Sequence, residues 1–203
     1  MKIEEMYKQK RPLISFEIFP PKRAEQLKNI DETLEILCGL KPDYISVTFG
    51  AGGSSVNSKT VELAKKIKYD YGIEPVVHLT CLNYSKDEIS AILDELKDAD
   101  IQNVLALRGD YNPDIPRKYD FNYASELAAF IKTQGDFDVA GGCYPEKHLE
   151  SPDLVTDIHN LKKKVDAGVG HLISQLFFDN DLYYDFLEKL KIADINVPVS
   201  AGI

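Results

Sequence analysis

Short runs of hydrophobic and β-branched residues recur along the chain about every thirty residues, the length of one β-strand plus one crossover helix. The first run ends at Pro20-Pro21, where the missing N–H groups stop further strand pairing. The pattern predicts seven strands, at Leu13–Phe19, Tyr44–Phe49, Pro75–Cys81, Asn103–Leu107, Phe137–Cys143, His171–Phe178 and Val197–Ala201. Strands separated by helix-length intervals indicate an α/β protein.

The intervals between the strands carry the hydrophobic spacing of amphipathic helices. Three stripes show it: Leu27, Ile30, Leu34 and Leu37; Ile89, Ile92, Leu93 and Leu96; and Leu154, Ile158, Leu161 and Val165. Ser85 to Glu88 is a capping-box pattern, and Ser151 before Pro152 predicts a second helix start with Ser151 as its N-cap. Glycines stand where helices are expected to stop, at Gly39, Gly72 and Gly168.

Parallel β/α units assemble as an open doubly wound sheet or as a (β/α)8 TIM barrel. An open sheet binds its ligand mainly at one switch point, whereas a barrel gathers residues from the C-terminal ends of many strands. Polar residues stand at or near almost every strand end here: Glu17, Thr48, His78, Arg108, Asp110, Tyr144 and Gln175. We therefore predict a single TIM-barrel domain over residues 1–203. Only seven units are visible, so the eighth strand and helix are expected to be missing, or another element covers the open edge.

Composition narrows the class of protein. The 203 residues are 44% hydrophobic and 28% charged, which is enough for one sizeable core. The formal net charge of −9 argues against a nucleic-acid binder. Three widely spaced cysteines suggest reduced thiols, and we expect no metal site, because neither a His-x-x-x-His pair nor clustered carboxylates occur. The sequence contains no signal-peptide pattern and no run of about 18 apolar residues, so we expect a soluble, cytoplasmic protein without membrane contact.

Glu17 is the first candidate for chemistry, because a carboxylate between Phe16 and Ile18 in a buried strand is costly unless it is partnered or protonated. The glycine-rich stretch 48–55 fits neither the Rossmann nor the P-loop spacing; a tight turn and a ligand cradle both remain open. His78 is either a hydrogen-bonded core histidine or a ligand contact.

Arg108-Gly109-Asp110 places a cation and a carboxylate at one strand end, as a binding element or as an ion pair that braces a loop. Tyr144 to His148 holds several titratable groups after the fifth strand. Asp157, Asn160 and Lys164 share one helix face, for which a solvated surface is the default. Gln175 is interpreted as a second polar residue buried among hydrophobic ones, and its amide needs hydrogen-bond partners there. No predicted strand carries a lysine for Schiff-base chemistry.

Several motifs occur together and in order: Ser-Phe-Glu-Ile-Phe-Pro-Pro-Lys, Val-Thr-Phe-Gly-Ala-Gly-Gly-Ser, His-Leu-Thr-Cys, Ala-Leu-Arg-Gly-Asp, Tyr-Pro-Glu-Lys-His, Lys-Lys-Lys-Val-Asp-Ala-Gly and Ser-Gln-Leu-Phe-Phe-Asp. As an ordered set they resemble the methylenetetrahydrofolate reductase family of flavin-dependent (β/α)8-barrel enzymes. The resemblance runs from about Leu13 to Ile203 and depends on no single motif.

The resemblance implies a function. The family reduces 5,10-methylenetetrahydrofolate to 5-methyltetrahydrofolate by ping-pong hydride transfer through non-covalent FAD, which NADH or NADPH recharges. Glu17 matches the general acid that protonates the departing folate nitrogen, and an apolar setting would raise its pKa as a proton donor requires. Asp110 matches an aspartate beside flavin and folate, and Gln175 a glutamine that contacts pterin and nicotinamide. Positions that match FAD contacts are Thr48, Phe49, Ala51, His78, Arg108, Gly109, Asp110, Ala124, Tyr144, His148, Asp157, Asn160 and Lys164.

The chain departs from the family pattern at Phe49, where tyrosine is common, and at Lys163, where arginine is frequent and a bidentate phosphate contact is lost. Ser200 to Ile203 replaces the more usual Pro-Gly-Ile. Two other functions stay open: a flavin-binding subunit that needs a partner chain, and a pterin-binding barrel without redox chemistry. The sequence leaves open NADH, NADPH or a ferredoxin-linked reductant, and whether the protein is a homo-oligomer.

Overall fold

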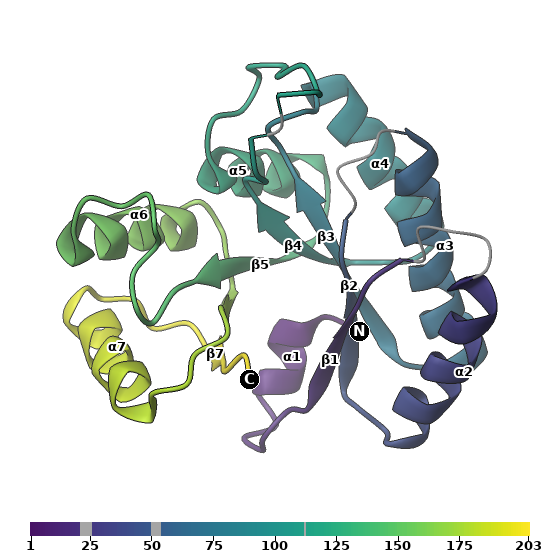
Figure 1. Ribbon diagram of the computed structural model, residues 1–203, viewed down its shortest axis with the longest axis horizontal. Helices are drawn as coiled ribbons and strands as arrows, with labels where there is room; N and C mark the ends of the chain where they lie inside the picture. The colour runs from purple at the N-terminus through teal and green to yellow at the C-terminus, as the bar shows by residue number, and fades with distance from the viewer. Residues whose placement is uncertain (21–25, 50–53, 112) are drawn as a thin grey trace.

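The computed structural model describes residues 1–20, 26–49, 54–111 and 113–203, without the side chains of 26–29 and 54–58. Its strands form one parallel sheet in the order β1-β2-β3-β4-β5-β6-β7, which is also their order along the chain. The strands are β1 Ser15–Ile18, β2 Tyr44–Val47, β3 Glu74–Thr80, β4 Asn103–Leu107, β5 Asp138–Cys143, β6 His171–Ser174 and β7 Val199–Ser200. The sheet curls around a central axis into an incomplete barrel (Figure 1).

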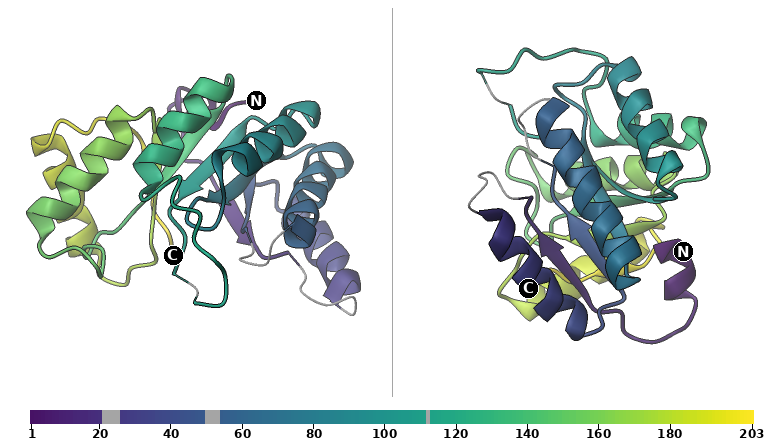
Figure 2. Two further views of the ribbon diagram at one scale, coloured as in Figure 1. Left: turned by 90° about the horizontal axis from the view of Figure 1, so that it is seen from above. Right: turned by 90° about the vertical axis from the view of Figure 1, so that its right-hand side faces the viewer.

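Seven helices accompany the strands within the described residues. They are α1 Ile3–Tyr7, α2 Gln26–Gly39, α3 Ser54–Tyr71, α4 Lys86–Asp98, α5 Ala124–Gln134, α6 Leu154–Asp166 and α7 Asn180–Ile192. Helices α2 to α7 surround the outer face of the curled sheet (Figure 1). They alternate with the strands along the chain, from α2 after β1 to α7 after β6. In the first view of Figure 2, α1 lies on one side of the sheet and the loop between β4 and α5 on the other.

The predicted helix signals are confirmed in part. Ser85 Oγ accepts the N–H of Glu88 while the Glu88 carboxylate accepts the N–H of Ser85, which is the expected capping box of α4. The four hydrophobic residues of its predicted stripe are all buried. The predicted start of α6 at Ser151 is wrong, because the N-cap is Asp153, whose carboxylate accepts the N–H of Thr156 at 2.7 Å. Helix α2 ends at Gly39, and glycines follow the ends of α3 and α6 as expected.

Two hydrophobic cores lie on opposite faces of the sheet. The larger core fills the space between the sheet and the outer helices and includes Ile18, Val47, Val77 and Leu79. The smaller core lies inside the curl at the N-terminal ends of the strands; its buried members are Ile3, Met6, Tyr44, Val76, Leu105 and Ala140. Successive strand residues point to opposite faces, so a polar residue next to core residues in sequence can still line the interior of the barrel.

Helix α1, which the sequence pattern did not predict, closes the bottom of the curl. Its N–H groups bind strand residues: Ile3 N donates to Asn103 Oδ1 at 3.0 Å, and Glu4 N donates to Asp138 Oδ2 at 2.9 Å. Tyr7 shares a hydrogen bond with Ser200 of β7. A helix of this length is unstable alone, so these tertiary contacts fix it.

All seven predicted strands are present, and several are shorter than predicted. The largest difference is at β6, predicted to reach Phe178 but ending at Ser174. The coarse prediction of an α/β fold with consecutive parallel strands is confirmed. Strands β1 and β7 pair on one side only, and the described residues include no eighth β/α unit between them. No helix in the described part of the chain is long and apolar enough to span a membrane.

Candidate active site

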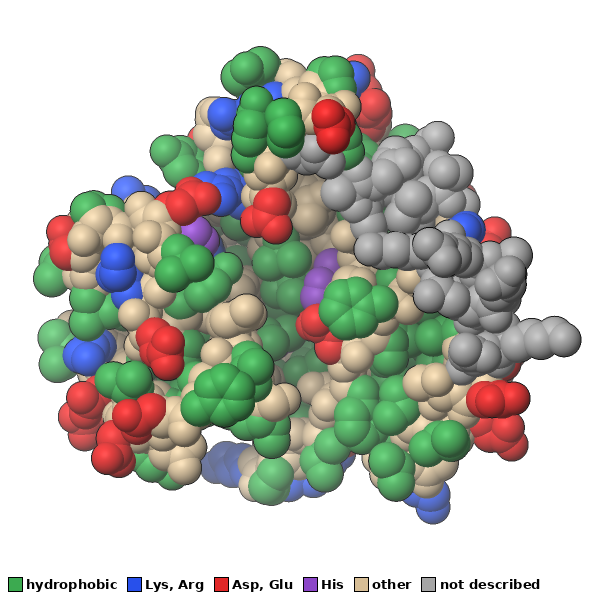
Figure 3. All heavy atoms as spheres, in the orientation of Figure 1, with side chains coloured by type: hydrophobic (Ala, Val, Ile, Leu, Met, Phe, Trp, Pro, Cys, Tyr) green, Lys and Arg blue, Asp and Glu red, His purple; other side chains and the backbone are tan. Residues whose placement is uncertain are grey.

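The C-terminal ends of the parallel strands meet at one face of the molecule, opposite α1. Figure 3 shows this face hollowed over the centre of the curled sheet, with hydrophobic side chains in the hollow and charged side chains around it. Most predicted site residues belong to strand ends or to the loops that follow them, so the fold brings together groups distant in sequence.

Glu17 lies on the interior face of β1, beside two polar residues of neighbouring strands. It pairs in register with Ser46 of β2, whose hydroxyl donates a hydrogen bond to the Glu17 carboxylate. On β3, His78 Nε2 lies 3.5 Å from Glu17 Oε2. Ser46 and His78 are buried, at 5% and 6% exposed. Ser46 was not predicted to belong to the site; the alternation of β2, with Ile45 and Val47 in the outer core, could have indicated it.

The expectation that Glu17 is buried is wrong in part, because its side chain is 48% exposed. Phe16 and Ile18 pack on the opposite face of the sheet, against the helices. Partial burial nevertheless raises the pKa of the Glu17 carboxyl, while the hydrogen bond from Ser46 acts in the opposite direction. The direction agrees with the predicted proton donor.

Burial lowers the pKa of His78 to about 4, so its imidazole is neutral at pH 7. The contact with Glu17 is therefore an imidazole–carboxyl contact rather than an ion pair. His78 Nε2 is buried and makes no hydrogen bond to any described residue. A buried polar atom without a partner is rare in a folded protein and needs an explanation.

Arg108, which follows β4, makes a bidentate ion pair with Glu150 in the loop between the neighbouring β5 and α6. Its NH2 nitrogen donates to Glu150 Oε1 at 2.7 Å, and its NH1 nitrogen donates to Glu150 Oε2. This pair and the nearby charge of Asp110, itself exposed, raise the pKa of Arg108, whereas burial opposes the rise. The loop-bracing interpretation of Arg108 is supported, although with Glu150 rather than Asp110. Glu150 was not predicted because it lies 42 residues away in sequence.

Gly109 connects Arg108 to Asp110 in a conformation that requires glycine. Its φ is +83°, and a Cβ atom there would lie 3.0 Å from Thr80 Cβ on the neighbouring strand. The turn thus sets how closely the loop after β4 approaches the end of β3.

We expect Gly109→Ala to lower the free energy of unfolding by about 1–3 kcal/mol, because a side chain at positive φ and a tight contact with Thr80 both cost energy. Chemical denaturation measures the change. Gly39→Ala is the matched control: Gly39 ends a helix, and nothing lies within 4 Å of the position that an alanine methyl group would take, so that variant should be neutral or slightly stabilised. Equal effects of the two substitutions would contradict the role of Gly109.

Lys164 reaches inward from α6. Its Nζ donates to the carbonyl of Gly142 on β5 at 2.9 Å. Burial lowers the pKa of the Lys164 amine, whereas the nearby Cys143 and Asp157 act to raise it. The default interpretation of a solvated face is therefore wrong for Lys164. It holds for Asn160, which is exposed and accepts a hydrogen bond from Lys163 Nζ at 3.1 Å.

The loop after β5 is tied to the same helix. Tyr144 and His148 pack edge to face with ring centroids 4.6 Å apart. The N–H of His148 donates to Asp157 Oδ2 at 3.1 Å. The Tyr144, His148, Asp157 and Lys164 side chains therefore belong to one connected region at the ends of β5 and α6.

The remaining predicted cofactor positions are more dispersed. The Thr48 carbonyl accepts from Thr60 Oγ1 at 3.3 Å, and Phe49 packs edge to face on Tyr84 with centroids 5.7 Å apart. Ala124 is the buried first residue of α5. Ala51 and the glycines 50, 52 and 53 lie outside the described residues, so the cradle prediction for that stretch stays untested.

The interpretation of Gln175 as a buried strand residue is wrong. Strand β6 ends at Ser174, and Gln175 follows it with its side chain exposed at the open face. Its N–H donates to the Cys143 carbonyl at 2.8 Å, and its carbonyl accepts from Ser174 Oγ at 3.0 Å. The amide side chain is thus positioned at the mouth of the curl, where a bound molecule can contact it.

These residues fit a flavin nucleotide. Arg108 supplies a guanidinium group that Glu150 already pairs with, Lys164 supplies a partly buried amine, and Tyr144 and His148 supply rings. The buried Nε2 of His78 has no hydrogen-bond partner among the described residues.

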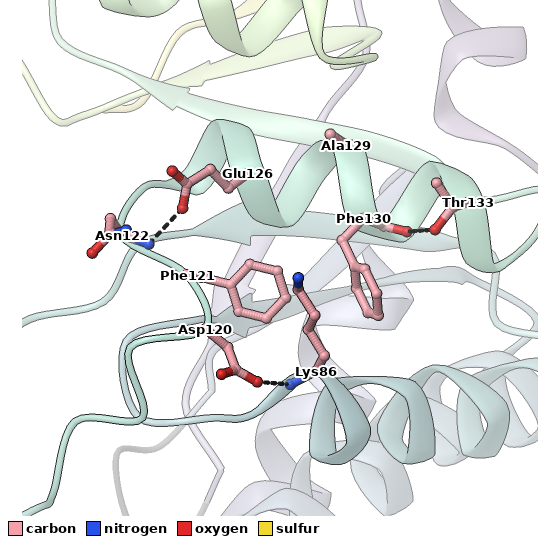
Figure 4. Close-up of a pocket in the computed structure, with 8 residues that line it drawn as sticks. All are labelled: Lys86, Asp120, Phe121, Asn122, Glu126, Ala129, Phe130 and Thr133. Carbon is pink, nitrogen blue, oxygen red and sulfur yellow. Dashed lines mark hydrogen bonds between the residues drawn. The ribbon is translucent and has the colours of Figure 1, made fainter.

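A separate pocket of about 390 Å³ lies on the outside of the molecule between α4 and α5 (Figure 4). Phe121 and Phe130 pack edge to face in it, and Lys86 Nζ lies 6.0 Å from the centre of the Phe121 ring. None of the predicted site residues lines this pocket. It is distinct from the hollow at the strand ends.

Comparison with known proteins decides the family. The model of the family described as methylenetetrahydrofolate reductase matches residues 2–203. The chain belongs to the methylenetetrahydrofolate reductase family. It is 37% identical over 190 residues to the 5,10-methylenetetrahydrofolate reductase of Escherichia coli K12, covering 94% of this chain and 63% of that protein. It is 35% identical to methylenetetrahydrofolate reductase (NADH) 1 of Arabidopsis thaliana, covering all of this chain and 36% of that protein. The chain thus spans less than two thirds of these family members.

Solved structures support the fold. A protein from Clostridium thermocellum, described as binding two copies of 5-methyl-5,6,7,8-tetrahydrofolic acid, superposes with a TM-score of 0.69 at 15% identity, over 99% of this chain and 69% of that one. A tryptophan synthase chain from M. tuberculosis superposes with a TM-score of 0.63 at 13% identity, over 99% and 78%. At these identities the likeness concerns the fold of this methylenetetrahydrofolate reductase family member.

Proposed function

We propose that this chain is the flavin-binding catalytic domain of an oxidoreductase that reduces 5,10-methylenetetrahydrofolate to 5-methyltetrahydrofolate, with NADH or NADPH as reductant. The observation that carries the proposal is Glu17, an acid with a raised pKa on the interior face of β1, next to Ser46 and His78. Family membership supports the substrate and the reaction, because the relatives in Escherichia coli and Arabidopsis thaliana carry that name.

Glu17 supplies the proton in this reaction. The carbon–nitrogen bond that opens in the folate ring leaves its electron pair on the departing nitrogen, and the Glu17 proton neutralises that nitrogen. FAD, when bound, supplies the hydride that completes the methyl group. Because Glu17 is half exposed, its carboxylate can regain a proton from solvent before the next turnover.

Asp110 and Gln175 are the proposed substrate contacts. Both side chains are exposed at the mouth of the curl, Asp110 after β4 and Gln175 after β6. A carboxylate and an amide together offer the acceptors and donors that a pterin ring requires. We propose that FAD binds to the strand-end residues described above for the open face. Lys164 and Arg108 are proposed to bind the anionic groups of FAD.

The folate half-reaction should depend on pH in a stated direction. Because the pKa of Glu17 is raised, the acid stays protonated to a higher pH than an ordinary glutamate. Oxidation of the reduced enzyme by 5,10-methylenetetrahydrofolate should therefore slow as pH rises through that pKa. Stopped-flow rates measured from about pH 5 to pH 9 check this, with the NADH half-reaction as the internal comparison.

The test of the function is reconstitution with FAD followed by anaerobic spectroscopy. The protein should bind FAD, lose the oxidised flavin absorbance with NADH or NADPH, and regain it with 5,10-methylenetetrahydrofolate while 5-methyltetrahydrofolate forms. Tetrahydrofolate without the methylene bridge is the matched control and should not reoxidise the flavin. Failure to bind flavin would overturn the proposal.

A second candidate is a flavin-binding subunit that needs a partner or a further segment to close the barrel. It is favoured by the outer sides of β1 and β7, which pair with no further strand among the described residues, and by the apolar Phe19 just after β1, which is 69% exposed. We propose that an eighth β/α unit occupies this gap in a complete barrel. Flavin bleaching by NADH without reoxidation by the folate would favour this candidate over the first.

A further inference from the structure

The Glu17 carboxyl and the His78 imidazole form a pair whose geometry has a chemical consequence. His78 Nε2 is buried, unpartnered among the described residues, and 3.5 Å from Glu17 Oε2. That separation is roughly half an ångström longer than an ordinary N–H···O hydrogen bond. Catalytic hydrogen bonds are often long in structures without substrate and shorten in the reactive complex.

The two tautomers of a neutral imidazole differ in what they offer Glu17. If Nδ1 carries the proton, the Nε2 lone pair faces a carboxylate oxygen, which is repulsive each time Glu17 has given up its proton. If Nε2 carries the proton, it can donate a hydrogen bond to Glu17 in either protonation state. It donates to the carbonyl oxygen when Glu17 is protonated and to a carboxylate oxygen when Glu17 has lost its proton. Only the second tautomer is favourable in both states of Glu17.

We propose that His78 is a positioning residue that donates Nε2–H to Oε2 of Glu17 and so confines the acid proton to the other oxygen, Oε1. The inference rests on the proposed role of Glu17 as the acid. Ser46 assists from β2 by donating its hydroxyl to the same carboxylate. Two neutral donors then hold the carboxyl in place and stabilise the anion that forms when the proton leaves.

The surroundings of the pair suit this task. His78 titrates near pH 4 because of its burial, so it remains a neutral donor through the working range and does not compete for the proton. In register, His78 pairs with the apolar Leu105 on β4, and Glu17 of β1 pairs with Ser46 of β2. Within the part of the chain that the structure describes, burial raises the pKa of Glu17 and Ser46 lowers it, and no charged side chain contributes.

The first test needs neither cofactor nor substrate. Long-range nitrogen NMR of the imidazoles reports the tautomer of each of the four histidines, and the His78 signals are identified by their loss in His78→Gln. We expect neutral His78 with its proton on Nε2 from about pH 5 to pH 8. A proton on Nδ1, or a charged ring, would overturn the inference whatever the enzyme's activity.

The second test measures the Glu17 pKa directly by carboxyl-carbon NMR in the protein without flavin. His78→Leu removes the donor and should raise the Glu17 pKa above that of the wild type; His78→Gln, whose amide nitrogen replaces Nε2, should return it toward the wild-type value. An unchanged pKa in His78→Leu that still folds would contradict the proposal. If His78→Leu fails to fold, the His78 tautomer measured in the wild type still tests the proposal.

The third test separates positioning from packing in the proposed reaction. His78→Leu should slow the folate half-reaction about tenfold to a hundredfold and move the fall in rate to higher pH, since a hydrogen bond to a forming anion is lost. His78→Gln should restore the pH profile. A purely structural role would lower the rate without moving the profile. If the wild type itself does not reduce the folate, the proposed function is wrong. The two NMR tests still show whether His78 donates a hydrogen bond to Glu17.

Discussion

Glu17→Gln is expected to slow the reduction of 5,10-methylenetetrahydrofolate by about 10²–10⁴-fold, the usual contribution of a general acid. Glutamine keeps the size of the side chain and can still accept a hydrogen bond from Ser46, but it has no proton to give at neutral pH. Flavin binding and flavin reduction by NADH need no proton from Glu17, so they should persist. Single-turnover measurements of the two half-reactions separate these effects.

A glutamate far from the strand ends gives the control for Glu17→Gln. Glu188 is exposed on α7, and Glu188→Gln changes the net charge by the same amount without touching the interior of the curl. It should leave both half-reactions close to the wild type. Equal losses in both half-reactions of Glu17→Gln would instead mean that Glu17 holds the site together and is not the acid.

The existence of the strands was predictable because each lies within a short apolar run, and the parallel order follows from the helix-length intervals between them. The pattern misled at β6, where Leu176 to Phe178 continue the apolar run beyond the last paired residue. Phe178 is 90% exposed and Phe177 is buried, so hydrophobic sequence there does not mark strand. Gln175 was judged buried for the same reason. Sequence neighbours decide burial only while the strand alternation continues.

The sequence predicted which strand-end residues belong to the site. It did not predict which of their side chains contact one another. Arg108 meets Glu150 and Glu17 meets Ser46 only because the curled sheet brings distant segments together. Lys164 shows the same limit, because a helix face of three polar residues does not reveal that one of them reaches a strand carbonyl. Helix α1 is too short to show a periodic pattern, and its position depends on Asn103 and Asp138, about 100 and 134 residues away.

Asp138 carries the second large prediction, because it joins α1 to the sheet from a fully buried position. Its Oδ2 accepts the N–H of Glu4, and its Oδ1 lies 3.6 Å from His171 Nδ1, which is too long for a hydrogen bond and makes this an electrostatic contact. Asp138→Ala removes both interactions and leaves a backbone N–H and a buried imidazole unpaired. We expect the free energy of unfolding to fall by about 3–5 kcal/mol, measured by denaturant titration.

The pH dependence of the free energy of unfolding tests whether the charge of Asp138 causes this stabilisation. Burial alone would raise the pKa of Asp138, but His171 and the N–H of Glu4 outweigh it and hold that pKa below its ordinary value. The stabilisation is therefore fully present above the pKa of an unfolded aspartate, about 3.9, and is lost as pH falls through the lower folded pKa. Asp138→Asn should lack this acid-dependent loss.

Asp136 offers the matched comparison, since it lies two residues away and pairs with Lys2 of the same N-terminal segment at the surface. Its side chain is 81% exposed, so water replaces the lost contact and Asp136→Asn should change stability far less than Asp138→Asn. Similar losses from the two substitutions would mean that net charge, and not the buried link between α1 and β5, sets the stability. A large loss of stability confined to the Asp138 variant would instead mean that α1 is an integral part of the fold. The backbone N–H groups of α1 then supply hydrogen bonds to a buried carboxylate that water does not reach.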